Sequence, residues 1–62
     1  MKKLDIAFVV VDKESGQEID YFTCNGNNNQ DVFDAHENAE LVARESYELE
    51  PWKTFEVKTE II

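Results

Sequence analysis

The chain has 62 residues, 42% of them hydrophobic and 32% charged, and its formal net charge is −8 at pH 7. A chain of this length is expected to form one small domain, residues 1–62, with little room for a deep active-site cleft. Direct binding to nucleic acid or to an anionic membrane is not expected, because Lys and Arg side chains hold both. Any partner is therefore expected to be basic.

The negative charge is concentrated in the middle of the sequence. Between Asp12 and Glu50, eleven acidic residues stand against only Lys13 and Arg44, which gives a net charge of −9, whereas the two flanks together carry +1. The negative field therefore belongs to the first turn, the second strand and the helix predicted below.

The first half of the chain has the pattern of a β-hairpin. Residues 4–11 (LDIAFVVV) are apolar on both faces over their second half, which is typical of a central strand. A polar turn follows at 12–17, where Gly16 can take a positive φ, and residues 18–24 predict the second strand. The next loop, 25–30, is rich in Asn and Gly, which tolerate left-handed conformations.

Residues 31–48 are the only segment with a sustained helical period. Asp31 is expected to be the N-cap, and the bond before Pro51 should end the helix near residues 48–49. On a helical wheel, one stripe is expected to pack on the sheet: Val32, Ala35, His36, Ala39, Val42, Ala43, Ser46 and Tyr47.

The last segment, residues 52–62, alternates in polarity and predicts a third, half-exposed strand. The expected fold is α+β, with the order ββαβ, a three-stranded sheet in the order 2-1-3, and one helix packed on one face. A third strand beside the second would fit the same periodicities. The face without a helix is expected to leave an apolar set toward solvent: Ala7, Val9, Val11, Phe22 and Trp52.

No residue pattern in the chain indicates catalysis. Cys24 has no cationic neighbour to lower its pKa, and His36 with Glu40 supplies only two potential metal ligands at helical spacing. The loop from Asn25 to Asp31 lacks the acidic and glycine positions of a calcium loop. We therefore expect no enzymatic activity, no metal and no other cofactor.

The sequence favours a cytoplasmic location. A single cysteine fits a reducing compartment, and no apolar stretch is long enough to span a bilayer. The apolar run near the start is short, is interrupted by Asp5, and lacks the small-residue cleavage site of a signal peptide.

The side of the helix opposite the packing stripe is the candidate binding surface. Its carboxylates extend over about 21 Å from Asp34 to Glu48, with Leu41 at the centre. Charged groups around an exposed leucine suit a protein–protein contact. With the acids of the first turn, the candidate partner-binding residues are Asp31, Asp34, Glu37, Leu41, Glu45, Glu48, Asp12, Glu14 and Glu18.

In length, charge and lack of catalytic residues the chain resembles the small acidic host-takeover proteins of bacteriophages, some of which mimic DNA. This resemblance implies an inhibitor in the cytoplasm of a bacterial host, whose carboxylates stand in for phosphates and occupy the basic surface of a nucleic-acid-binding protein. Histone-like nucleoid proteins, polymerase and defence nucleases are targets of that class.

Two other functions fit the same sequence. In the first, the chain is a structural or adaptor subunit in which Val9, Val11 and Trp52 on the open sheet face form the interface, and a homodimer is the simplest assembly that covers this face. In the second, it is a small regulatory or enzyme-accessory domain, although no pocket is evident.

Overall fold

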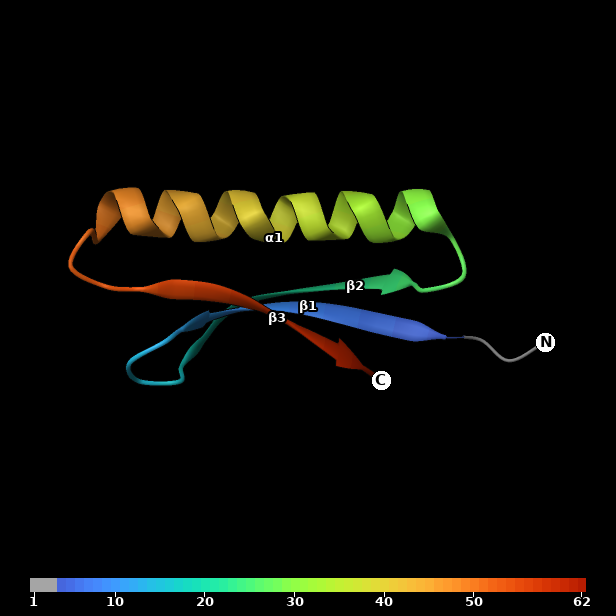
Figure 1. Cartoon of the computed structure of the whole chain (residues 1–62), viewed down its shortest axis with the longest axis horizontal. Helices are drawn as coiled ribbons and strands as arrows, with labels where there is room; N and C mark the ends of the chain where they lie inside the picture. Colours follow the sequence, from blue (N-terminus) through green and yellow to red (C-terminus); the bar gives the residue numbers. More distant parts are fainter. Residues whose placement is uncertain (1–3) are drawn as a thin grey trace.

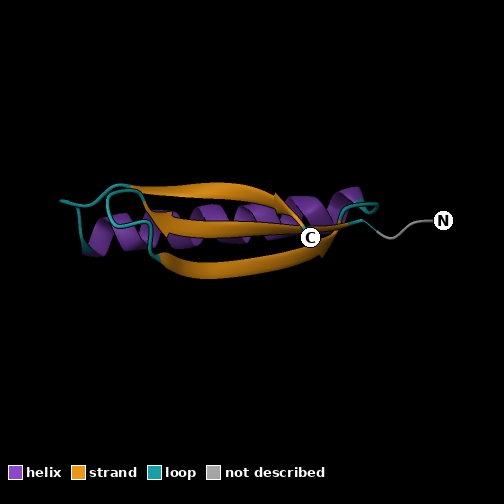
Figure 2. Cartoon of the chain, turned by 90° about the horizontal axis from the view of Figure 1, so that it is seen from below, coloured by secondary structure: helices purple, strands orange, loops and turns teal. Residues whose placement is uncertain are grey.

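A computed structural model describes residues 4–62 and contains three strands and one helix (Figure 1). Strand β1 covers Asp5–Asp12, β2 covers Glu18–Asn25, helix α1 covers Asn29–Leu49 and β3 covers Phe55–Ile61. The helix lies along one side of the sheet, and no helix of residues 4–62 covers the other side (Figures 1 and 2). The predicted α+β class and the ββαβ order are confirmed.

Strand β1 is the centre of an antiparallel sheet with the order β2-β1-β3 (Figure 2). Phe8 lies opposite Phe22 on one side and Thr59 on the other, and this register is kept along both ladders apart from a bulge at Val10 and Val11. The predicted strand order is therefore confirmed, and the alternative that places β3 beside β2 is wrong.

The core between sheet and helix is built from large side chains on the strands and small ones on the helix. Phe8 and Val10 of β1 pack with Cys24 of β2 against Ala35 and Ala39 of α1. Ala39 is completely buried. Because alanine has only a methyl side chain, the helix axis can approach the sheet closely enough for Phe8 and Val10 to fill the space between them.

The apolar stripe on the open face of the sheet is buried, contrary to our expectation. Ala7, Val9 and Val11 expose 4% of their surface or less. The stripe is one strand wide, and cross-strand neighbours flank it on the same face, with Tyr21 and Lys58 on either side of Val9. Long side chains on the two edge strands cover short ones on a central strand, so no partner is needed to bury them.

The two aromatic residues assigned to the open face are also placed elsewhere. Phe22 lies opposite Phe8 and packs against the core on the helix side. Trp52 is 71% exposed and belongs to the turn between α1 and β3, because that strand begins only at Phe55. Pro51 and the two residues after it form a turn and a bend, so they do not extend the strand.

Helix α1 begins two residues before the predicted start and is capped by a different residue. Asn28, not Asp31, is the N-cap, and its side chain accepts hydrogen bonds from the backbone N–H groups of Gln30 and Asp31. Asp31 instead accepts a hydrogen bond of 2.9 Å from the backbone N–H of Asn25 at the end of β2. The helix ends at Leu49, within the predicted range.

The two glycines serve different purposes. Gly16 has a φ of 76°, as predicted for the turn between β1 and β2. Gly26 does not have a positive φ, but a Cβ on it would lie 2.8 Å from Cδ1 of Ile6 and 2.9 Å from Cγ of Leu4. The loop after β2 therefore needs a glycine for close approach to β1 rather than for a left-handed backbone.

Candidate acidic binding surface

The acids predicted to face away from the sheet do so. Asp34, Glu37, Glu45 and Glu48 are exposed, while Ala35 and Ala39 on the opposite side of the helix are buried. Leu41 is 45% exposed among them. We call the side of α1 that carries Phe33, Asp34, Glu37, Leu41, Arg44, Glu45 and Glu48 the outer helix face.

Most carboxylates of the outer helix face have no internal partner. Asp34 accepts a hydrogen bond of 2.9 Å from the side chain of Gln30. Within residues 4–62, Glu37, Glu45 and Glu48 have neither an ion pair nor a side-chain hydrogen bond, and Arg44 has no ion pair. Their charges are therefore available to a partner.

The carboxylates of the outer helix face are spaced more widely than the phosphates of DNA. Four of them lie between Asp34 and Glu48, a rise of about 21 Å at ~1.5 Å per residue, which corresponds to a mean spacing of about 7 Å. One strand of B-DNA carries a charge about every 3.4 Å. The row therefore has about half the axial charge density of one DNA strand.

Sequence reasoning overlooked two members of the outer helix face. Phe33 is 62% exposed and precedes Glu37 by one helical turn. Arg44 follows Leu41 by three residues and places one cation among the acids. The same helical wheel that locates the acids also places both residues on this face, so the helical period was the signal for them.

The margin of the helix differs from the prediction at Tyr47 and His36. Tyr47 was expected to pack on the sheet, but it is 53% exposed. The side chain of His36 is half exposed, its Nε2 lies 3.4 Å from Oε1 of Glu40, and its ring meets Phe8 edge-on with centroids 5.1 Å apart. In the described part of the chain, no group of three potential ligands is arranged to hold a metal ion.

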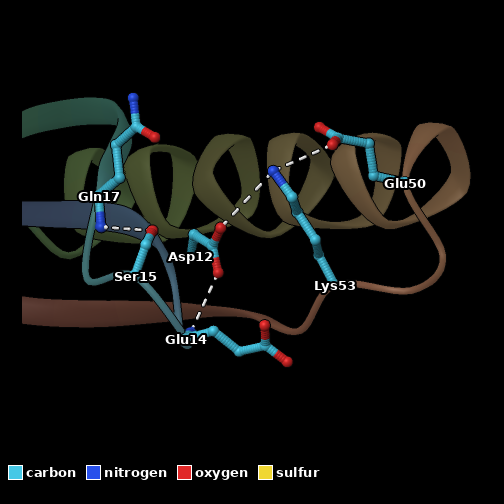
Figure 3. Close-up of polar contacts among 6 residues, drawn as sticks. All are labelled: Asp12, Glu14, Ser15, Gln17, Glu50 and Lys53. Carbon is cyan, nitrogen blue, oxygen red and sulfur yellow. Dashed lines mark hydrogen bonds and ion pairs between the residues drawn. The ribbon is translucent and has the colours of Figure 1, made fainter.

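Asp12 does not belong to the exposed acidic surface, although it was one of the candidate partner-binding residues. It is 4% exposed, and its carboxylate accepts a hydrogen bond of 3.0 Å from the backbone N–H of Glu14. Lys53 reaches between Oδ2 of Asp12, at 3.8 Å, and Oε2 of Glu50, at 3.0 Å (Figure 3). This cluster joins the end of β1 to the turn that follows the helix.

The environment of the cluster favours the charged forms of Asp12 and Lys53. Burial by itself raises the pKa of Asp12, but hydrogen bonds from Glu14 and Ser15 and the charge of Lys53 outweigh it, so the pKa lies below its usual value of 3.8. The hydrogen bond and charge of Glu50 raise the pKa of Lys53. Asp12 therefore has a structural role in the turn.

The remaining acids of the hairpin are exposed. Glu14 lies in the turn between β1 and β2, and Glu18 begins β2. The backbone N–H of Lys13 donates to the carbonyl oxygen of Thr54, which places this turn at the C-terminal end of α1 (Figure 1). Glu14 and Glu48 thus belong to the same end of the molecule, while Asp31 lies at the other end beside Asn25.

Cys24 has the character of a core residue. It is 8% exposed, and burial together with the nearby charges of Asp31 and Asp5 raises the pKa of its thiol. A shallow depression of about 370 Å³ adjoins it, lined by Asp5, Thr23, Cys24, Asn25 and Ile62. Burial and these charges disfavour the thiolate, which is the form of a cysteine that reacts as a nucleophile.

Comparison with known proteins yields no relative. No protein-family model matches the sequence, and no curated protein or solved structure gives a significant match. Within residues 4–62, no helix combines the length and the apolar character required to cross a membrane.

Proposed function

We propose that the chain is a non-enzymatic nucleic-acid mimic, which occupies the basic DNA-binding surface of a protein in the cytoplasm of a bacterial host and inhibits it. The observation that carries this proposal is the set of exposed carboxylates on the outer helix face, of which Glu37, Glu45 and Glu48 have no ion pair within residues 4–62. A histone-like nucleoid protein is the partner of first choice.

Electrostatics supports a function for this charge. The net charge of −8 destabilises a small fold through self-repulsion, and within residues 4–62 Glu37, Glu45 and Glu48 form no ion pair that would offset it. A basic partner provides the missing counter-charges. The row of carboxylates lies on a helix that is already formed, so the partner does not have to order the backbone that carries them.

The adaptor alternative has lost its main support. It relied on an exposed apolar stripe, but Val9 and Val11 are already buried within the single chain, and Trp52 lies outside the sheet. We therefore do not propose a second function.

The test is a competition experiment with defined components. A fluorescent DNA duplex is bound to a purified bacterial histone-like nucleoid protein, and its release by the chain is followed by fluorescence anisotropy. We expect stoichiometric release at low salt and a steep loss of affinity as the salt concentration rises, because the contacts are ionic.

Two charge-matched double variants separate the outer helix face from net charge alone. Glu37→Lys/Glu48→Lys and Glu56→Lys/Glu60→Lys change the net charge equally, but the second pair lies on β3. The concentration of protein that releases half of the DNA should rise at least tenfold more for the first variant than for the second. The far-ultraviolet circular dichroism of both variants should be unchanged. Equal losses, or no release by the unmodified chain, would contradict the proposal.

A further inference from the structure

We infer that Phe33 and Leu41 are apolar anchors. Through them, the outer helix face binds a basic protein surface with two apolar recesses more tightly than it binds a uniform polycation. This inference rests on the proposed function and specifies the partner's chemistry. It predicts that charge attracts the partner and that the two apolar side chains determine which basic partner is held.

The two side chains lie on one ridge of the helix. Phe33, Glu37 and Leu41 follow one another at intervals of four residues, so they are neighbours along the same side of α1. Phe33 and Leu41 are separated by about 12 Å along the axis. They are 62% and 45% exposed, and neither belongs to a core cluster of the fold.

Their position is unusual for an amphipathic helix. The side opposite the packing stripe normally carries polar residues, and Asp34, Glu37 and Glu48 follow that rule. The large aromatic side chain of Phe33 lies outside both core clusters of the described residues and leaves most of its surface exposed. Aromatic and aliphatic side chains that fill recesses supply much of the affinity of helix-in-groove contacts.

Charge complementarity defines the surface that can receive this ridge. The carboxylate of Glu37 lies between the two apolar residues, and a purely apolar groove would bury it without a partner at a high cost. A recess rimmed by Lys or Arg pairs with the carboxylates and still accepts Phe33 and Leu41. A flexible polycation pairs with the same carboxylates but has no recess.

The experiment compares two probes and two matched double variants. The probes are a purified bacterial histone-like nucleoid protein and poly-L-lysine. The test variant is Phe33→Ala/Leu41→Ala, and the control is Tyr47→Ala/Leu49→Ala, which removes two exposed apolar side chains of α1 that lie off the outer helix face. Affinities are measured over a range of salt concentrations, and circular dichroism checks the fold.

We expect the test variant to bind the nucleoid protein at least tenfold more weakly than the unmodified chain, with an unchanged salt dependence. It should bind poly-L-lysine normally, and the control should behave like the unmodified chain with both probes. Full affinity of the test variant for the nucleoid protein would overturn the anchor role and leave the mimic proposal standing. Absence of binding by the unmodified chain would overturn both proposals.

Discussion

At the scale of single residues, Asp12 shows how the fold assigns different roles to chemically identical groups. In the sequence it is one of fourteen acids, and nothing in its neighbourhood distinguishes it from Glu14. In the structure it is buried, accepts a hydrogen bond in the turn and faces Lys53, whereas Glu14 projects into solvent. Its carboxylate stabilises the hairpin and is unavailable to a partner.

The lowered pKa of Asp12 predicts a specific loss of stability in acid. Because the folded-state pKa is below the unfolded value, taken as 3.8, the ionised carboxylate stabilises the fold above that pH, and this contribution is lost as the pH falls through the folded-state value. Asp12→Asn cannot ionise. Above pH 4, the free energy of unfolding of this variant in urea should be lower than that of the unmodified chain. The difference between the two should shrink as the pH falls below 3.8.

A second variant identifies the contribution of the nearby cation. Lys53→Met removes the charge beside Asp12 but leaves the hydrogen bonds from Glu14 and Ser15 in place. In the Lys53→Met variant, the stability that the ionised carboxylate of Asp12 contributes above pH 4 should be smaller but still present. If the difference between Asp12→Asn and the unmodified chain is constant from pH 6 to pH 2.5, the carboxylate does not stabilise the fold in its ionised form.

At the scale of elements, the start of α1 depends on the side chain of Asn28. Its Oδ1 lies 3.1 Å from two backbone N–H groups of the first turn that have no partner within the helix. Asn28→Ala should destabilise the protein by about 1 kcal/mol in urea unfolding, as is typical of a lost N-cap. Asn28→Asp keeps an acceptor at this position and should retain most of the stability.

Asp31 provides the comparison that tests this capping assignment. Its carboxylate accepts a hydrogen bond from the backbone N–H of Asn25 at the end of β2 and not from the start of the helix. The helical content of Asp31→Ala should therefore exceed that of Asn28→Ala under mildly denaturing conditions. The opposite order would show that the helix is capped by Asp31.

The helix also illustrates why amphipathic periodicity locates faces better than their margins. The centre of the packing stripe, Ala35 and Ala39, is buried as the wheel predicts, whereas Tyr47 at its edge is exposed. Burial at the margin depends on whether a strand lies underneath. The three-stranded sheet is narrow, so a large side chain at the edge of the stripe reaches past it.

At the scale of the whole molecule, the net charge of −8 is a source of instability that salt should relieve. Carboxylates of α1 recur about every 5 Å, well within the screening length of about 30 Å at 10 mM salt and of about 10 Å at 0.1 M. The urea midpoint of the unmodified chain should therefore rise between 10 mM and 500 mM NaCl.

The charge-neutralised variant Glu37→Gln/Glu48→Gln is the control for this effect. It keeps side chains of similar size on the outer helix face but removes two of the repelling charges. Its urea midpoint should be higher at low salt and should respond less to added NaCl. A midpoint that does not change with salt in the unmodified chain would mean that self-repulsion does not limit its stability.

The sequence by itself determined the features that depend on local patterns. Apolar residues on both faces of β1 indicated a central strand, alternation and helical period located the other elements, and these together predicted the β2-β1-β3 order. The wheel also predicted which carboxylates of α1 face solvent. These features follow from side-chain periodicity, which is a property of neighbouring residues in the chain.

Only the tertiary structure decided the features that depend on contacts between distant segments. It buried Val9 beneath neighbours from β2 and β3, placed Asp12 against Lys53, and directed the side chain of Asp31 to the end of β2 while Asn28 caps the helix. In each case the deciding partner lies on another element. Burial and hydrogen bonding are settled by the space that the elements leave between them, and the pattern along one segment does not contain that information.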